Sequence, residues 1–395
     1  MAKKTIRDVD VQDQKVLVRV DFNVPLDVNT GQISDDSRIR AVLPTIKYLV
    51  QHKAKVILCS HLGRPEGKVV EGLRLAPISK RLSELVKLPV ATVPDCIGSD
   101  VEKAVNNLKR GDILLLENVR FHAEEEANDP SFAQALAKLA DIYVDDAFGT
   151  AHRAHASTVG VAKYLPAVAG LLMEKELTRL GGILSHPEHP FAALLGGAKV
   201  SDKIGLIQNI LNMVDKLLIG GGMAATFLKA QGYSVGVSLL ESDKLGLAQE
   251  LMDAANQKNV SLLLPVDVVV ADSESRDATG QTVDITNITE NKSIVDIGPK
   301  TVEIFSKQIT PCKTVFWNGP MGIYEIEQFS AGTKAMAALL AGLKATTIVG
   351  GGSTAEIVEK MNLADRMSHV STGGGASLQF LEGKTLPGVA VLQDK

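Results

Sequence analysis

Short, mainly apolar runs alternate along the chain with longer segments in which apolar residues recur at helical spacing. In the first half, the helical spacing is clearest over Ile39–Gln51 and Phe132–Leu139. Strands that alternate with helices in this way form parallel sheets through βαβ crossovers. The pattern therefore predicts strands at Val16–Val20, Val56–Cys59, Ile113–Leu116 and Ile142–Val144.

The second half repeats the same rhythm. Between the halves, Leu171–Leu184 has helical spacing, and the Ser-His-Pro-Glu-His-Pro run that follows cannot extend a helix, so this helix should end near Ser185. The strands expected after it are Phe191–Leu195, Lys216–Ile219, Ser261–Leu264, Thr314–Trp317 and Thr346–Val349. We therefore expect an α/β fold with two Rossmann-like lobes, each a doubly wound parallel sheet, joined by a connecting helix with a cleft between them.

Length and composition agree with two domains and exclude several kinds of partner. A chain of 395 residues exceeds what one hydrophobic core usually fills. A net charge of −4 with 4% aromatic residues disfavours nucleic-acid and anionic-lipid surfaces. Three widely spaced cysteines, Cys59, Cys96 and Cys312, argue against a disulfide framework and for a reducing cytoplasm. The chain lacks a signal-peptide pattern and long apolar runs, so we expect no membrane span.

The most specific local signal is Leu194–Ile204, where an apolar run breaks at two glycines and restarts with lysines four residues apart. The restart predicts a helix that carries Lys199 and Lys203 on one face. Like charges at this spacing repel, so the pair suits a place where a negative ligand lies between them, and a helix amino terminus also favours an anion. The alternative is a solvated surface pair beside Asp202.

Polar and basic residues follow the expected strands of the first half. In doubly wound sheets, ligands bind outside the carboxyl ends of the strands, so these residues should converge. Guanidinium groups suit phosphate and carboxylate, which implies a small, doubly anionic ligand. Surface ion pairs for the arginines, a plain loop histidine and a turn-capping role for the first two polar residues remain alternatives. The residues concerned are Asp21, Asn23, Arg38, His61, Arg64, Arg120 and Arg153.

Glycine clusters follow the strands of the second half. Gly220–Gly222 and Gly350–Gly352 each begin a Gly-x-Gly-x-x-Ala match, which keeps a nicotinamide-dependent dehydrogenase open. No Walker A sequence occurs, which disfavours a P-loop kinase. Glycine turns with two lysines suit a nucleotide whose phosphates approach backbone N–H groups. Glu325, after another expected strand, either accepts ribose hydroxyls or is a plain solvent-facing acid.

Seven motifs in order resemble the phosphoglycerate kinase family, from about Thr5 to Leu392. They are Asp-Phe-Asn-Val-Pro, Ser-His-Leu-Gly-Arg-Pro, Glu-Asn-Val-Arg-Phe, Asp-Ala-Phe-Gly-Thr-Ala-His-Arg-Ala-His, Gly-Gly-Ala-Lys-Val-Ser-Asp-Lys-Ile, Trp-Asn-Gly-Pro-Met-Gly and Ser-Thr-Gly-Gly-Gly-Ala-Ser. The resemblance implies reversible phosphoryl transfer between 1,3-bisphosphoglycerate and ADP, giving 3-phosphoglycerate and ATP, with magnesium on the nucleotide. It also implies a glycerate-phosphate-binding domain at 1–170, an interdomain helix and hinge at 171–187, a nucleotide-binding domain at 188–380 and a C-terminal tail at 381–395 that returns to the first domain.

Carried over position by position, the resemblance gives the site residues their roles. The catalytic residues it implies are Arg38, Lys199 and Lys203, with Lys199 on the migrating phosphoryl group. The substrate-binding residues it implies are Asp21, Phe22, Asn23, Arg38, His61, Leu62, Gly63, Arg64, Arg120 and Arg153. The nucleotide-binding residues it implies are Lys203, Gly220, Gly221, Ile294, Asn318, Glu325, Gly351, Gly352, Ser353 and Thr354.

Two positions depart from the family pattern. Ser353 stands where the family usually has an Asp near the magnesium, so no metal ligand is assigned, and water or nucleotide phosphates should supply more of the coordination. Ile294 stands where the family often has a glycine near the adenine, which changes little if only the backbone is used.

The implied reaction needs charge stabilisation rather than a general base, because the acceptor carboxylate is already ionised at pH 7. Negative charge spreads over the transferring group, so cations from both lobes should surround it, and we expect in-line transfer on domain closure. A dehydrogenase and a non-catalytic phosphometabolite-binding protein remain the alternatives. We expect a cytoplasmic monomer that acts on these small molecules without nucleic acid or membrane.

Overall fold

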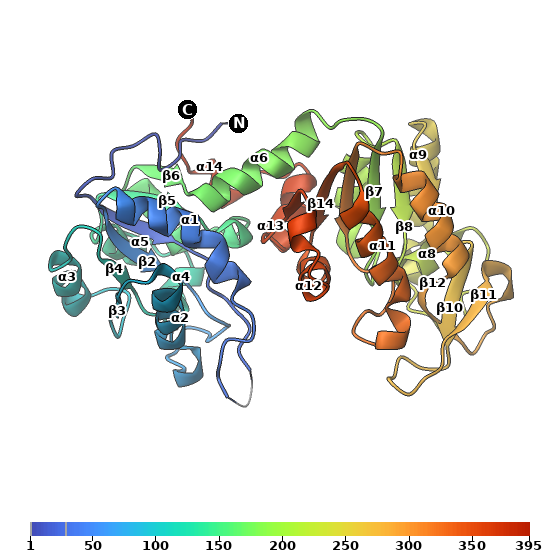
Figure 1. Ribbon diagram of the computed structural model, residues 1–395, viewed down its shortest axis with the longest axis horizontal. Coiled ribbons are helices and arrows are strands. Elements are labelled where there is room, and N and C mark those ends of the chain that lie inside the picture. Colours follow the sequence, from blue (N-terminus) through green and yellow to red (C-terminus); the bar gives the residue numbers. More distant parts are fainter. Residues whose placement is uncertain (1, 28–29) are drawn as a thin grey trace. The chain divides into compact units, whose positions relative to one another are not determined.

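The computed structural model describes residues 2–27 and 30–395, which divide into two compact units. Unit 1 comprises Met1–Thr178 and Thr385–Lys395, and unit 2 comprises Arg179–Lys384. The boundary falls inside α6 (Leu171–Ser185), which is a continuous helix. Each unit is built around its own six-stranded sheet (Figure 1).

The sheet of unit 1 is parallel throughout, with the strand order β3-β4-β2-β1-β5-β6. Its strands are β1 (Lys15–Arg19), β2 (Lys55–Cys59), β3 (Val90–Thr92), β4 (Ile113–Leu115), β5 (Ile142–Asp145) and β6 (Ala167–Ala169). The helices of this unit besides α6 are α1 (Ser37–Gln51), α2 (Ala76–Val86), α3 (Ser99–Asn106), α4 (Ala123–Glu126), α5 (Pro130–Ala137) and α14 (Pro387–Ala390).

Both faces of this sheet are buried. On one face, apolar side chains of α1 and α2, such as Ile46, form a core with alternate strand residues such as Val18 and Leu58. The intervening residues Leu17 and Ile57 are buried as well. A parallel sheet covered on both sides needs such continuous apolar strands, which is why the strands stand out in the sequence.

The larger sheet of unit 2 is also parallel, with the strand order β15-β14-β13-β7-β8-β9. Its strands are β7 (Phe191–Leu195), β8 (Lys216–Ile219), β9 (Ser261–Leu263), β13 (Thr314–Asn318), β14 (Thr346–Gly350) and β15 (His369–Val370). The helices are α7 (Ile204–Ile210), α8 (Met223–Ala230), α9 (Leu245–Gln257), α10 (Pro299–Ile309), α11 (Ala331–Gly342), α12 (Gly352–Lys360) and α13 (Gly375–Leu381).

A second sheet of unit 2 has three antiparallel strands in the order β11-β10-β12. These strands are β10 (Asp267–Ala271), β11 (Gln281–Asp284) and β12 (Ser293–Ile297). Val268 and Ile294 of this sheet pack with Ala225 and Leu228 of α8 in a small core. The sheet thereby brings β12 next to the helix that begins after the Gly220–Gly222 turn.

The start of α6 is held by side chains of unit 1. Asp146, directly after β5, accepts hydrogen bonds at Oδ1 from Leu172 N at 2.9 Å and Met173 N at 3.0 Å. Leu171 N donates to Thr45 Oγ1 of α1 at 2.9 Å. Three amide groups of the first turn are therefore satisfied by buried side chains.

The last residues of the chain contact unit 1. Gln393 N donates to Ala167 O at 3.0 Å, and Gly388 N donates to Ala151 O at 2.8 Å. Asp394 forms an ion pair with Lys3 at 2.8 Å. The segment Thr385–Lys395 therefore lies along the strand β6 and the loop that follows β5.

The expected fold class and the strands predicted from apolar runs are confirmed within one or two residues. The helix predicted to carry both lysines on one face is wrong, because Lys199 lies in a loop and only Lys203 lies in the short 3-10 turn Ser201–Lys203 that precedes α7. Gly197, with φ +98°, starts this loop. The antiparallel sheet was not predicted, because its strand β11 is largely exposed and carries no apolar run.

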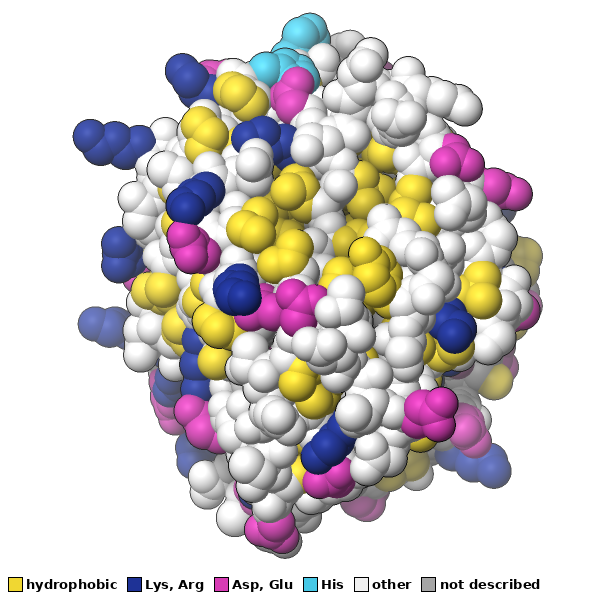
Figure 2. Space-filling view, turned by 90° about the vertical axis from the view of Figure 1, so that its right-hand side faces the viewer, with side chains coloured by type: hydrophobic (Ala, Val, Ile, Leu, Met, Phe, Trp, Pro, Cys, Tyr) yellow, Lys and Arg dark blue, Asp and Glu magenta, His cyan; other side chains and the backbone are white. Residues whose placement is uncertain are grey.

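No helix in residues 2–27 and 30–395 combines the length and apolar character needed to cross a membrane. Figure 2 shows one face of unit 2, where acidic and basic side chains are interspersed and hydrophobic side chains gather in the hollows between them.

Candidate functional site

The loops that leave β1, β2 and β4 of unit 1 are tied together at the carboxyl edge of the sheet. Asn23 Oδ1, after β1, accepts a hydrogen bond from Gly63 N, after β2, at 2.8 Å. Arg120 Nη1, after β4, donates to Gly63 O at 2.9 Å. The polar segments that follow separate strands in the sequence therefore meet, as expected from the parallel topology.

Arg38 and His61 join the same region through Asp21. Arg38 Nη1 lies 2.8 Å from Asp21 Oδ2, and His61 Nδ1 lies 3.9 Å from Asp21 Oδ1. Arg120 Nε lies 3.1 Å from Glu126 Oε1 without hydrogen-bond geometry, so that nitrogen is left without a partner in the described part of the chain. A buried N–H without an acceptor is costly unless a ligand supplies one.

Arg19 is a functional candidate that the sequence analysis missed. Its Nη2 lies 3.1 Å from His61 Nδ1. A guanidinium can only donate, so Nδ1 accepts and the ring proton of a neutral His61 sits on Nε2. Arg19 Nε donates to Ser157 Oγ at 2.8 Å, and Ser157 Oγ donates to Glu125 Oε1 at 2.6 Å. This buried chain of hydrogen bonds fixes the orientation of the His61 ring.

The protonation state of His61 reflects the positive charges of the arginines around it. Burial and the surrounding guanidinium charges lower the pKa of His61 well below its ordinary value. The charges responsible belong to Arg19, Arg120, Arg153 and Arg38. Burial also lowers the pKa of Arg120. The Glu126 carboxylate opposes this shift, and neighbouring cations add to it. His61 is therefore a neutral hydrogen-bond donor inside a strongly positive region.

The remaining predicted substrate-binding residues have different surroundings. The side chains of Phe22 and Leu62 belong to the hydrophobic core, and their amides already donate to Ser60 Oγ at 2.9 Å and to Asn118 Oδ1 at 3.3 Å. Gly63 has φ +63°, and a Cβ there would lie 2.8 Å from Leu73 Cδ2. Arg64 is exposed, and Arg153 is partly exposed with its Nε 3.2 Å from His152 Nε2.

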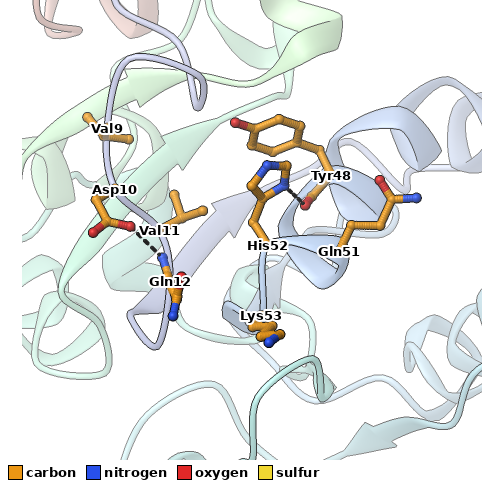
Figure 3. Close-up of a pocket in the computed structure, with 8 residues that line it drawn as sticks. All are labelled: Val9, Asp10, Val11, Gln12, Tyr48, Gln51, His52 and Lys53. Atoms are coloured by element: carbon orange, nitrogen blue, oxygen red, sulfur yellow. Dashed lines mark hydrogen bonds between the residues drawn. The ribbon is translucent and has the colours of Figure 1, made fainter.

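A pocket of about 210 Å³ elsewhere in unit 1 lies at the opposite edge of the sheet. Its lining comes from residues 9–12, before β1, and from Tyr48 and residues 51–53, at the end of α1 and before β2. Figure 3 shows Tyr48 stacked on His52, with ring centroids 3.9 Å apart. The amino ends of parallel strands form this edge, so the pocket is separate from the basic cluster.

In unit 2, the two lysines of the glycine-lysine loop occupy contrasting environments. Lys203 is buried, and its Nζ donates to Asn318 Oδ1 at the end of β13. Burial, opposed by Asp202, lowers the pKa of Lys203 to about 8. Lys199 is exposed. Hydrogen bonds from Ser201 and Val200 hold the pKa of Glu241 below its ordinary value against the effect of burial, and the charge of Lys199 adds a smaller contribution.

A pocket of about 290 Å³ lies between the glycine turns and the antiparallel sheet of unit 2. Four of the predicted nucleotide-binding residues line it: Gly221, Ile294, Glu325 and Ser353. Lining residues that the sequence analysis did not predict include Ser238, Leu239, Asp296 and Tyr324. The mixture of apolar side chains, the exposed carboxylates of Glu274 and Glu325, and glycine backbone suits a flat ring attached to a polyhydroxyl and charged group.

The glycines around this pocket allow loops to approach each other closely. A Cβ at Gly196 would lie 2.1 Å from Pro320 O, and one at Gly319, with φ +94°, would lie 2.3 Å from Gly196 O. Gly220 is similarly crowded by Met321 Sδ at 2.6 Å. These glycines are required by packing, whatever they contribute to a ligand.

The residues that follow β14 differ in how much free space surrounds them. Gly351 has φ +90° and precedes α12, and a Cβ at Gly352 would meet nothing within 4 Å. Thr354 is buried, and its Oγ1 accepts a hydrogen bond from Gly319 N at 2.7 Å. Asn318 Nδ2 is buried without a hydrogen-bond partner among the described residues. Thr354 thus supports the loop, whereas Gly352 stays open to a ligand.

Comparison with known proteins gives one consistent family. The phosphoglycerate kinase family model matches residues 6–384. The chain is 58% identical over 399 residues to a phosphoglycerate kinase of Dictyoglomus turgidum and 56% identical over 395 residues to one of Moorella thermoacetica, with 100% of each chain covered. The structure of phosphoglycerate kinase from Coxiella burnetii matches with a TM-score of 0.88 at 45% identity, covering 98% of both chains. That from Pyrococcus horikoshii matches with a TM-score of 0.83 at 31% identity over the same share of each chain.

Full-length matches at this identity remove both alternatives left by the sequence, the dehydrogenase and the non-catalytic binding protein. The strand order and the match to solved structures agree with that outcome. The chain belongs to the phosphoglycerate kinase family and is a phosphotransferase with a carboxyl group as acceptor, active in glycolysis and gluconeogenesis.

Proposed function

We propose that the carboxyl edge of the unit 1 sheet binds 3-phosphoglycerate and 1,3-bisphosphoglycerate. The observation that carries this assignment is the group of guanidiniums around a neutral His61. Arg38, Arg120 and Arg153, with exposed Arg64, would pair with the phosphate and carboxylate groups. Asp21, Asn23 and His61 Nε2–H would hold the hydroxyl and carboxylate oxygens. Phe22, Leu62 and Gly63 would shape the site around the ligand, because their amides already donate within the protein.

The pocket of unit 2 would bind ADP and ATP. Glu325 would accept hydrogen bonds from the ribose, and Ile294 would lie against the adenine, with Leu239 as a further apolar contact. Backbone N–H groups of Gly351 and Gly352, with Thr354 holding the loop and Asn318 beside the buried lysine, would position the phosphates. Gly220 and Gly221 would contribute through the close approach of their turn, because their N–H groups already donate to Leu195 O and Met321 O. Lys203 would pair with a nucleotide phosphate, which supplies the negative charge that burial of its ammonium requires.

Magnesium would arrive as part of the nucleotide substrate. The side chain at position 353 is a hydroxyl, and the carboxylates that line the pocket are those of Glu274, Asp296 and Glu325. Asp296 already accepts hydrogen bonds from Ile297 N and Gly332 N, and burial raises its pKa to about 7. This donor set fits an ion held chiefly by phosphate oxygens and water, with Ser353 as a neutral contact.

Phosphoryl transfer depends on neutralising charge and on aligning the two substrates. The carboxylate of 3-phosphoglycerate needs no base, so the protein has to place it in line with the terminal phosphate and neutralise the charge on the transferring group. Arg38 of unit 1 and Lys199 of unit 2 would do so. Because the ligands are bound by different units, we infer that in-line transfer requires closure about the interdomain helix, within the proposed domain division 1–170, 171–187, 188–380 and 381–395.

The same residues support a proposal for the working form of the enzyme. The full set of proposed ligand contacts lies within one chain, so we propose a monomer. We also propose that it acts in the cytoplasm, where its substrates and a reducing environment for its three free, buried cysteines occur together.

Calorimetric titration of each ligand separately tests whether unit 1 binds 3-phosphoglycerate and unit 2 binds the nucleotide. Arg120→Met should weaken 3-phosphoglycerate binding at least about tenfold and leave Mg-ADP binding within about twofold. Glu325→Gln should do the reverse. Arg110→Met, which removes a surface arginine paired with Asp13, is the matched control and should change neither. Loss of ADP affinity in Arg120→Met with intact folding would contradict the assignment.

A further inference from the structure

Three side chains of different chemistry meet in unit 1 beside the proposed glycerate site. Asp95 and Cys96 follow β3, and His122 follows the turn after β4. These strands are parallel neighbours, so both loops leave the same edge of the sheet. One ligand atom from each of the three side chains lies within 4.8 Å of the other two.

The positions of these side chains are fixed by their neighbours. His122 Nε2 lies 2.7 Å from Asp95 Oδ1, and the Cys96 amide donates to the same oxygen at 2.6 Å. The His122 ring packs against Phe132, with centroids 5.1 Å apart. Glu117 N donates to Asp95 O at 3.3 Å, which joins the two loops. The three groups therefore form a defined cluster on two loops that are joined to each other.

Solvent exposure within the cluster is lowest at Cys96, higher at His122 and highest at Asp95. Cys96 is 0% exposed, whereas the side chains of His122 and Asp95 are 26% and 49% exposed. An ion from solvent would reach the carboxylate and imidazole first and the sulfur last. Burial raises the pKa of the Cys96 thiol well above its ordinary value.

Sulfur, nitrogen and oxygen donors together select a borderline transition-metal ion. Magnesium and calcium prefer oxygen-only ligands, whereas Zn²⁺ takes Cys, His and Asp together in tetrahedral sites. We propose that Asp95, Cys96 and His122 form a Zn²⁺ site, with water as the fourth ligand. This site is distinct from the magnesium-nucleotide site on unit 2.

Binding requires a small outward movement and the loss of a proton. Tetrahedral Zn²⁺ holds oxygen and nitrogen ligands about 3.3 Å apart, against the present 2.7 Å, so the exposed His122 and Asp95 side chains must separate slightly. The neutral imidazole binds through Nε2 with its proton on Nδ1. The Cys96 thiol releases its proton to solvent and binds as thiolate, and two anionic ligands then balance the charge of the ion.

Cobalt substitution tests the site directly, because Co²⁺ bound to thiolate gives a near-ultraviolet charge-transfer band. The full-length, chelator-treated protein titrated with Co²⁺ should show this band at one equivalent per chain. Cys96→Ala should abolish it. Cys312→Ala is the matched control, since Cys312 is a buried thiol of unit 2 outside the cluster, and should retain it.

His122→Gln separates metal binding from folding, because it leaves the buried thiol in place and alters a partly exposed side chain. This variant should bind Co²⁺ at least about tenfold more weakly. Zn²⁺ should raise the thermal midpoint of the original chain and of Cys312→Ala but not of Cys96→Ala or His122→Gln. Absence of the charge-transfer band, or its persistence in Cys96→Ala, would overturn the proposal and leave an ordinary Asp–His hydrogen bond.

Discussion

The two units present positive charge to their proposed ligands in different ways. In unit 1, the cations are guanidiniums, and Arg19 and Arg120 are buried and held by hydrogen bonds. In unit 2, a buried lysine and an exposed lysine accompany turns in which the backbone itself approaches the pocket. Ligand binding in unit 1 therefore depends on charged side chains. Ligand binding in unit 2 depends more on glycines, whose lack of a side chain lets the backbone approach the pocket.

This difference matches the ligands that the units are proposed to hold. A small dianion offers little surface besides its charges, so several forked donors must meet around it. A nucleotide offers a long, varied surface, so shape and backbone donors contribute more and fewer cations suffice. Substitutions should accordingly damage unit 1 through charge and unit 2 through crowding, with Lys199 as the exception that serves the transferring group.

The largest expected effect is at Lys199. Lys199→Ala should lower kcat by about 10²–10³, because one donor to the transition-state charge is lost. KM for either substrate should change by less than about threefold, since the exposed ammonium contributes little to ground-state binding. Steady-state kinetics in the ATP-consuming direction measures both quantities. Equal proportional losses in kcat and in ligand affinity would contradict this role.

Crowding in unit 2 should produce the next largest effect. Gly319→Ala places a Cβ 2.3 Å from Gly196 O at φ +94°, so the unfolding free energy of unit 2 should fall by about 3 kcal/mol. Gly246→Ala is the control, because a Cβ there meets nothing within 4 Å. Urea unfolding followed by circular dichroism gives both values. Equal stability of the two variants would show that the glycine turn has room to adjust.

In unit 1, Arg19→Met should act through His61 rather than through direct contact with substrate. Loss of the donor to Nδ1 frees the ring to change tautomer, so KM for 3-phosphoglycerate should rise about tenfold. The pKa of His61 should move up toward its ordinary value, because one neighbouring positive charge is gone. Proton NMR titration of His61 measures the second effect, and an unchanged pKa would refute the link.

The smallest effect concerns the pH dependence of Lys203. Its pKa of about 8 means that the ammonium is charged at pH 7 and largely neutral above pH 9, so ADP should bind several-fold more weakly there. In the folded state this group binds its proton less tightly than in the unfolded chain, where the pKa is near 10.5. The unfolded state therefore holds more protons between pH 8 and 10.5, and stability should rise across that window. Lys203→Met should flatten both trends in calorimetry and urea unfolding.

The parallel sheets could be predicted because buried strands leave continuous apolar runs such as Phe191–Leu195. The convergence of His61 and Arg120 could be predicted because parallel strands bring their carboxyl ends to one edge. The antiparallel strands were missed: β11 is largely exposed, so its sequence carries no apolar run.

The residues missed in the sites have equally physical reasons. Arg19 lies within the apolar β1, where a charged residue in an otherwise buried strand was the only signal of a buried guanidinium. The loop position of Lys199 depends on contacts of Gly196 and Gly197 with the Pro320 region, distant in sequence. Helical spacing alone could not reveal those contacts.

The interdomain helix α6 has unequal mechanical properties along its length. Its first turn is held by Thr45 of α1 and by Asp146, directly after β5, and must follow the movements of unit 1. Further along, Gly181 and Gly182 stand together inside the helix, where each glycine weakens helical order by about 0.5–1 kcal/mol relative to alanine. The first turn of α6 is thus fixed, whereas the helix is weaker near its other end. Any bending of α6 should therefore concentrate at the glycine pair.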